Sequence, residues 1–87
     1  GKAAVVNSLA NVAYYQGRFD EAEPLYEEAL QIARERGNKT AIAVSLNNVG
    51  LVAQDKGDYA RARQCYEEGL VIRREMGDTR GIANLLT

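Results

Sequence analysis

Histidine is absent from this 87-residue sequence, which also contains only one cysteine and one proline. The missing histidine removes the commonest general base and most ligand sets for transition metals. A lone cysteine cannot build a disulfide framework or a metal site within the chain. We therefore expect no catalytic constellation, no bound metal and no cofactor, and we do not expect an enzyme.

Long apolar runs are also absent. None approaches the ~20 residues that a membrane-spanning helix needs, and the first residues do not show the charged, apolar and cleavage segments of a secretory signal. We expect no membrane partner and a cytoplasmic location. Gly1 has no methionine before it, so we expect a cut or engineered end of a longer protein.

Neither sign of charge predominates in the sequence. The 11 basic and 12 acidic residues give a net charge of −1, which provides no general attraction for phosphate backbones. Nucleic acid is therefore not an expected partner. Hydrophobic residues make up 46% of the sequence and charged residues 26%, a balance typical of a soluble, folded domain.

The sequence repeats itself after forty residues. Of the 47 residue pairs with this separation, 17 are identical, and a fixed period of this size is typical of stacked supersecondary units. The identical pairs include Asn7 with Asn47, Val12 with Val52, Ala13 with Ala53, Gly17 with Gly57, Ala22 with Ala62, Tyr26 with Tyr66, Leu30 with Leu70 and Gly37 with Gly77. We assign repeat one to residues 1–40, repeat two to residues 41–80 and the start of a third repeat to residues 81–87.

Each repeat contains two apolar patterns with the spacing of a helix. In repeat two, one pattern runs from Ile42 to Ala53 and the other from Tyr59 to Ile72. Glycines separate these patterns, because a helix commonly ends at a residue with positive φ, which glycine adopts freely. We expect an all-α fold of two antiparallel hairpins stacked in the same sense, with helices at residues 3–16, 19–36, 39–56 and 59–76.

Several residues are expected at the helix ends. Gly37 and Gly77 should end the second helix of each hairpin, and Asp78 should cap the helix that follows Gly77. Asp58 should cap the fourth helix in the same way. We place Pro24 in the first turn of the second helix, where the missing N–H does little harm.

Small and aromatic residues recur at fixed positions in both repeats. Repeat two reads Leu46-x-x-Val49-Gly50-x-x-Ala53 and then Ala62-x-x-x-Tyr66, and repeat one reads Val6-x-x-Leu9-Ala10-x-x-Ala13 and then Ala22-x-x-x-Tyr26. This pattern resembles the tetratricopeptide repeat. The resemblance implies an α-solenoid, a right-handed superhelix of stacked helical hairpins. Its small residues let helix backbones approach closely, and its tyrosines fill the space between hairpins.

The repeat differs from the common form in length. Its period is 40 rather than 34 residues, and Arg34 and Arg74 stand where the common repeat has its helix-ending proline. This longer form is similar to the repeats of kinesin light chains, spindle-orientation adaptors and bacterial signalling regulators. The segment Glu21-Ala22-Glu23-Pro24-Leu25-Tyr26 is especially similar to the kinesin light chain type.

The resemblance implies an interaction scaffold that binds a peptide or a partner domain in a concave groove lined by the first helix of each hairpin. An asparagine amide offers a donor and an acceptor to a peptide backbone, and tyrosine adds flat apolar area with a polar tip. The candidate peptide-binding residues are Asn7, Asn11, Tyr14 and Tyr15 in repeat one, beside Ser8, and Asn47, Asn48, Leu51, Gln54 and Asp55 in repeat two. They could equally form an ordinary solvated helix face. On the binding interpretation, replacing Asn48 should change thermal stability little.

Some repeats of the family bind a C-terminal carboxylate through a clamp of asparagines and cations. Asn11 and Asn48 match its asparagines, but Asn7 and Asn84 occupy its lysine positions. Without the cations the charge-assisted bonds are missing, so we do not expect this clamp.

Two other functions remain open at this point. One is self-association, giving a homo-oligomer through exposed repeat ends, because stacked repeats bury their faces only against neighbours. The apolar residues Ile82, Ala83, Leu85 and Leu86 would form such an end. The other is a regulatory repeat segment of a larger signalling or transcription-regulating protein.

Two further expectations concern the second helices. We interpret Cys65 as a small, partly buried hydrophobe rather than a redox or metal residue. Glu21 and Glu23 are expected near Arg61 and Arg63 of the next hairpin, in exposed ion pairs that contribute only ~0 to 1 kcal/mol each.

Overall fold

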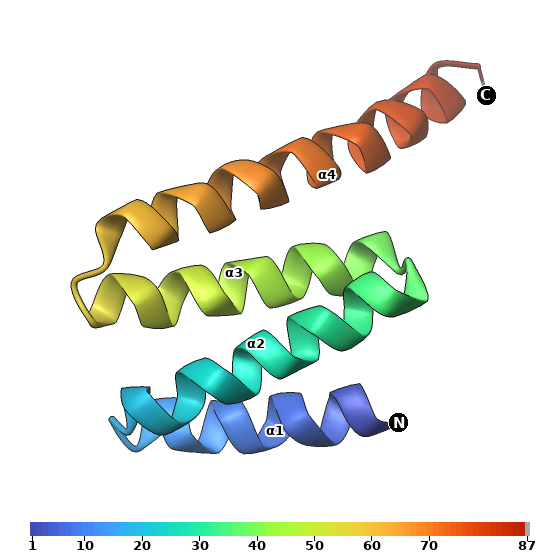
Figure 1. The fold of residues 1–87 in the computed structure, drawn as a ribbon. Helices are drawn as coiled ribbons and strands as arrows, with labels where there is room; N and C mark the ends of the chain where they lie inside the picture. The colour runs from blue at the N-terminus through green and yellow to red at the C-terminus, as the bar shows by residue number, and fades with distance from the viewer. Residues whose placement is uncertain (87) are drawn as a thin grey trace.

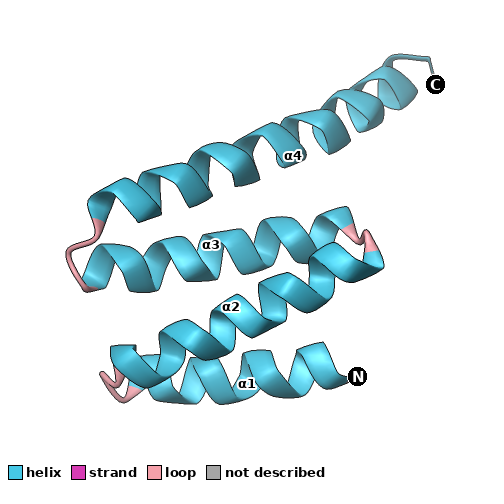
Figure 2. Ribbon diagram, viewed as in Figure 1, coloured by secondary structure: helices cyan, strands magenta, loops and turns pink. Residues whose placement is uncertain are grey.

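The computed structural model of the protein describes the backbone of residues 1–86 and the side chains of residues 1–77. Its helices are α1 (Lys2–Tyr15), α2 (Phe19–Arg36), α3 (Lys39–Asp55) and α4 (Tyr59–Leu86). Figure 1 shows that consecutive helices run in opposite directions, and each packs against the next. The turns between them are short (Figure 2), and the described residues contain no strand. The predicted all-α class and stacking of helical hairpins are confirmed.

The turns inside the two hairpins are built alike. Gly17 and Gly57 have φ values of 79° and 86°. The N–H of Arg18 donates to the carbonyl of Ala13, and the N–H of Asp58 donates to the carbonyl of Ala53, both at 2.8 Å. These residues are separated by forty positions, so the sequence repeat is also a repeat of backbone geometry. As predicted, Asp58 caps its helix, since its Oδ1 accepts from the N–H of Arg61 at 3.2 Å.

The predicted end of the fourth helix at residue 76 is wrong, because α4 continues through Gly77 to Leu86. Its equivalent, Gly37, has a φ of 65° and ends α2. Ending the helix at Gly37 gives up helical hydrogen bonds. This loss is offset by the packing of α3 on α2 and by the Asn38 side chain, which accepts from the N–H of Ala41. No described helix packs on the far side of α4, so the continuous helix, which keeps its backbone hydrogen bonds, is favoured.

The expected cap at Asp78 and the apolar side of residues 82–86 lie outside the described side chains. Thr87 lies outside the described backbone. The assignment of residues 81–87 to a third repeat stays a prediction.

Pro24 lies deeper in α2 than predicted. The helix begins at Phe19 and the proline is inside it, which leaves the carbonyl of Asp20 without its usual helical donor. Asp20 is exposed, so water can bond to this carbonyl at little cost.

Small residues allow the helices to approach closely, as predicted. Ala10, Ala22 and Ala62 are buried. At Gly50, an added Cβ would lie only 2.7 Å from Cε1 of Tyr66, so the ring occupies the space that a side chain would need. The main buried cluster contains Ala10, Ala13, Ala22, Tyr26, Leu30, Leu46, Val49, Val52 and Cys65.

The first and second helices of the hairpins stack in different registers. Between α1 and α3, side-chain hydrogen bonds join residues 41 positions apart. Between α2 and α4, ion pairs join residues 34 positions apart, Arg34 with Glu68 at 2.7 Å and Arg61 with Glu27. Relative to the forty-residue repeat, contacts between the second helices are shifted by six residues, about 9 Å along a helix.

This shift overturns the ion pairs predicted for Glu21 and Glu23. Arg61 reaches Glu27 rather than either of them, and Arg63 pairs with Glu67 of its own helix. Glu21 pairs with Arg18 at 3.4 Å. Glu23 pairs at 3.0 Å with Lys56, at the turn between α3 and α4. The sequence period identifies equivalent positions, but the axial displacement of packed helices decides which of them meet.

Replacing Gly50 with alanine is expected to lower the free energy of unfolding by about 1 kcal/mol. Displacing the Tyr66 ring costs about 1–3 kcal/mol, and the better helix propensity of alanine returns up to about 1 kcal/mol. Urea denaturation followed by circular dichroism measures this difference. Gly69→Ala is the matched control, because the nearest atom to an added Cβ there is 3.8 Å away. This substitution should raise the free energy of unfolding. Equal stability of the two variants would contradict the close contact.

Candidate functional site

Two hydrogen bonds bring predicted peptide-binding residues of α1 and α3 together. The Nδ2 of Asn48 donates to Oδ1 of Asn7 at 3.2 Å. In the second bond, the hydroxyl of Tyr14 donates to Oδ2 of Asp55 at 2.5 Å. These four residues therefore lie on adjoining faces of the first helices, and we call this surface the α1–α3 face.

Two other predicted residues are held by tyrosines of the second helices. The hydroxyl of Tyr26 donates to Oδ1 of Asn11, and that of Tyr66 donates to Oε1 of Gln54 at 3.0 Å. Tyr26 and Tyr66 are equivalent in the two repeats, so each hairpin uses the same tyrosine to fix a polar side chain of its first helix. This role of the tyrosines was not predicted, although their equivalence is visible in the sequence repeat.

The remaining predicted residues are more exposed and are not all on one surface. Tyr15 is largely exposed and packs its ring edge against Tyr14, with 5.7 Å between centroids. Leu51 is also exposed. Val44, a second exposed apolar residue of α3, was not among the predicted residues. Asn47 lies apart from the others, at a hollow between α3 and α4.

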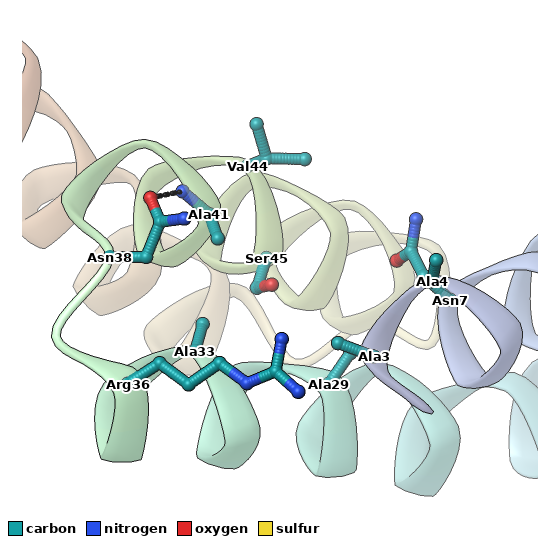
Figure 3. Close-up of a pocket in the computed structure, with 10 residues that line it drawn as sticks. All are labelled: Ala3, Ala4, Asn7, Ala29, Ala33, Arg36, Asn38, Ala41, Val44 and Ser45. Atoms are coloured by element: carbon teal, nitrogen blue, oxygen red, sulfur yellow. Dashed lines mark hydrogen bonds between the residues drawn. The ribbon is translucent and has the colours of Figure 1, made fainter. Parts of the chain in front are cut away.

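A cavity of about 240 Å³ lies between α1, α2 and α3. Half of its ten lining residues are alanines, whose small apolar side chains leave the space open. Figure 3 shows Asn7 at one side and the Arg36 side chain extending across the cavity from α2. The lining residues are Ala3, Ala4, Asn7, Ala29, Ala33, Arg36, Asn38, Ala41, Val44 and Ser45. The cavity is therefore continuous with the α1–α3 face at Asn7.

The electrostatics of this region arise from burial and short polar contacts. The hydrogen bond to Asp55, followed by partial burial and the Asp55 charge, raises the pKa of Tyr14 to about 12. Burial is also the main reason that the pKa of the Cys65 thiol is raised. Cys65 is almost completely buried, so its predicted place among the hydrophobic residues is confirmed, and it is more deeply buried than predicted.

The chemistry of the described side chains is limited to hydrogen bonding, apolar contact and exposed charge. Among them, no group of three histidine, cysteine, aspartate or glutamate residues could hold a metal ion. Within the described residues, no helix is long and apolar enough to cross a membrane. At the position of the carboxylate clamp, Asn7 and Asn48 bond to each other, and the side chain of Asn84 lies outside the description.

In a comparison with protein families, the tetratricopeptide repeat model matches residues 2–75. The chain belongs to the tetratricopeptide repeat family. Repeats of this family generally mediate protein–protein interactions. No match was found among curated proteins or among solved structures.

Replacing Asn48 with alanine is expected to lower the free energy of unfolding by about 1 kcal/mol, since Oδ1 of half-buried Asn7 loses its donor. This differs from the small effect expected from the sequence. Asn47→Ala is the matched control, because its exposed side chain makes no hydrogen bond to another side chain and should change stability by less than about 0.5 kcal/mol. Urea denaturation compares the two. Equal effects would show that the Asn7–Asn48 bond contributes nothing.

Replacing Asp55 with asparagine is expected to bring the pKa of Tyr14 down from about 12 toward the ordinary tyrosine value of about 10. Because folding raises this pKa, the bond's contribution to stability is complete below pH 10 and is lost as the pH rises through 12. Ultraviolet titration of tyrosinate measures the change, and Tyr14→Phe identifies the signal. Burial also raises the pKa of Tyr26 and Tyr66, so the test concerns only the signal that Tyr14→Phe removes. If that signal still titrates late in Asp55→Asn, the assignment is wrong.

Proposed function

We propose that the chain is an interaction scaffold that binds an extended peptide segment of a partner protein on the α1–α3 face. The observation that carries this proposal is the Asn7–Asn48 pair beside an open apolar cavity. Such a site combines a bond to the peptide backbone with a pocket for one side chain, the arrangement expected of a specific peptide site.

The bond between the two asparagines leaves one amide nitrogen and one amide oxygen entirely unused. Asn48 uses Nδ2 and Asn7 uses Oδ1, so Nδ2 of Asn7 can donate to a peptide carbonyl and Oδ1 of Asn48 can accept from a peptide N–H. Their mutual bond also fixes both side chains before binding, which reduces the entropy lost on association.

The cavity and the exposed apolar residues supply the second part of the site. Its alanine walls fit an aliphatic side chain that enters from the α1–α3 face. Leu51 and Val44 on α3 and Tyr15 on α1 are exposed and offer apolar contacts along the peptide. We propose that apolar side chains give affinity, whereas the asparagines hold the backbone whatever its sequence.

Several broader statements belong to the same proposal. We infer a non-enzymatic protein that works in the cytoplasm, with neither a nucleic acid nor a membrane as partner. The repeated turns at Gly17 and Gly57 support a division into repeat one at 1–40 and repeat two at 41–80. The third repeat beginning at 81 is proposed from the sequence repeat alone. A regulatory role within a larger signalling or transcription-regulating protein is compatible with this scaffold.

Self-association is the second candidate function. It is favoured by a stripe of exposed apolar residues on α1, formed by Val5, Leu9 and Val12. These residues lie four and three positions apart and therefore share one side of the helix. Burying them in an oligomer would remove apolar surface from water.

The peptide proposal is tested with a phage-displayed library of random peptides selected on the folded chain. Synthetic copies of enriched peptides are then titrated into isotope-labelled protein. We expect the largest NMR shift changes at Asn7, Asn48 and Leu51, and a loss of affinity of roughly tenfold in Asn7→Ala, about one hydrogen bond. Gln64→Ala, an exposed change on α4, should bind normally. No enrichment, or shifts confined to α4, would reject this function.

A further inference from the structure

The first helices of the hairpins carry far less charge than the second helices. α1 and α3 together contain three charged residues, Lys2, Lys39 and Asp55, whereas α2 alone contains eight. Both lysines turn to the second helices, where Lys2 pairs with Glu28 and Lys39 pairs with Glu75. Asp55 is thus the one charged residue of α1 and α3 that is directed to the α1–α3 face.

Asp55 keeps the capacity to bind a cation. Its Oδ2 accepts the hydrogen bond from Tyr14, and no lysine or arginine among the described side chains forms an ion pair with it. Asp55 is exposed and is the last residue of α3. Figure 1 shows that α1 runs in the same direction as α3, and α1 also ends here, at Tyr15. The partial negative charge of two helix C-termini therefore adds to that of the carboxylate, and this end of the face favours a cation.

Asp55 belongs to a row of residues on one side of α3. The four members follow one another at intervals of four, three and four residues, so they share that side of the helix. They are Val44, Asn48, Leu51 and Asp55, and we call them the α3 row. Val44 is 46% and Leu51 is 38% exposed, and Val44 also lines the cavity between α1, α2 and α3 (Figure 3). The α3 row thus presents a cavity with an apolar rim, an amide, an apolar side chain and a carboxylate, in that order.

The side of a first helix that carries this row stays open beside a neighbouring hairpin. α3 has a hairpin before it, and α1 has a hairpin after it. The α1 equivalents of Val44 and Asp55 are Ala4 and Tyr15, and all four residues are exposed. A hairpin on either side therefore leaves this face uncovered, so the exposure of the α3 row does not depend on where a stack of hairpins ends.

The axial distances along the α3 row define the spacing of groups in a ligand. At about 1.5 Å per residue, Leu51 lies about 10.5 Å from Val44, and Asp55 lies about 16.5 Å from it. A peptide in the polyproline II conformation rises about 3.1 Å per residue with about three residues per turn, so every third side chain shares one side, at about 9 and 19 Å. The long side chain of lysine or arginine covers the remaining difference of about 2 Å.

The same peptide conformation suits the amides of the face. A polyproline II segment makes no internal hydrogen bonds, so its backbone groups are available to a binding partner. The unused atoms, Nδ2 of Asn7 and Oδ1 of Asn48, lie beside the cavity and between the two apolar members of the row. They can therefore bond to the peptide backbone between its two apolar side chains.

We propose that the α1–α3 face binds a peptide with two aliphatic residues three positions apart and a lysine or arginine three positions beyond them. The first aliphatic side chain enters the cavity beside Val44, the second packs on Leu51, and the cation binds Oδ1 of Asp55. This inference rests on the proposed peptide-binding function and adds the composition, spacing and order of the bound segment. Its charge requirement is opposite to that of a carboxylate clamp, in which the protein supplies the cations.

NMR titration with two synthetic peptides tests the charge requirement. Acetyl-Leu-Pro-Gln-Leu-Pro-Gln-Arg-amide is compared with the same peptide ending in glutamine, at low ionic strength, where screening is weak. We expect the arginine peptide to bind about threefold more tightly, as for an exposed ion pair. In Asp55→Asn, which keeps an acceptor for Tyr14, the two peptides should bind equally. Glu35→Gln is the matched control, since it removes an exposed carboxylate from α2 and should preserve the difference.

Two further measurements separate this inference from the proposed function. Leu51→Ser should weaken both peptides equally, because it removes only apolar contact. Peptides enriched from the phage library should carry the aliphatic pair and the basic residue at the stated spacing. Enriched peptides that shift Asn7 and Asn48 but lack the basic residue would overturn this inference and leave the proposed function standing.

The remaining outcomes are equally clear. An arginine peptide that does not bind, or binds no more tightly than the glutamine peptide, contradicts the assignment of Asp55. An arginine preference that survives in Asp55→Asn does the same. If the library yields no peptide at all, the proposed function is rejected and this inference falls with it.

Discussion

The tyrosine rings of the second helices connect the packing of each hairpin to the polar surface of its first helix. Tyr66 lies against the bare backbone of Gly50, and Tyr26 is buried between helices. The hydroxyl at the far end of each ring holds a polar side chain, Asn11 or Gln54. Because one residue serves both purposes, the helix spacing and the positions of the polar groups are fixed together.

Hydrogen bonding then divides the predicted polar residues into those already engaged and those still available. Asn7 and Asn48 share one bond, which leaves Nδ2 of Asn7 and Oδ1 of Asn48 unused. Tyr14 and Asp55 are joined more tightly, and the pKa of Tyr14 reflects that bond. A surface ordered in this way has fewer side-chain conformations, because the fold has already positioned its polar groups.

The sequence predicted the fold well where local rules decide it. The apolar period and the glycines located α1, α2 and α3 to within a residue or so. Gly77 shows the limit, since it is identical to Gly37 in the repeat but lies within a helix. A glycine permits a turn, but packing of the next helix decides whether the turn is made. The ion pairs of Glu21 and Glu23 were wrong for a related reason, because periodicity does not determine axial displacement.

The candidate site was predictable in composition but not in geometry. Residue types and helix periodicity selected Asn7, Asn48 and Tyr14, yet their bonding partners depend on how α1 and α3 sit side by side. The cavity was not predicted, because small residues were considered only for close helix contact and the alanines that line the cavity were given no role. Small residues at some positions bring backbones together, and at others, such as Ala29 and Ala33, they leave space.

The unequal registers of the two helix layers have a mechanical consequence. The first helices advance by about one repeat between contacts and are joined by two hydrogen bonds, of which the Asn7–Asn48 bond is partly buried. The second helices are joined by exposed ion pairs, Arg34 with Glu68 and Arg61 with Glu27, which contribute only ~0 to 1 kcal/mol each. When a longer array of such hairpins bends, the second helices would therefore slide past one another before the first helices do. The spacing of groups along the layer of first helices would change last, so the polar side chains of that layer would keep their relative positions while the array flexes.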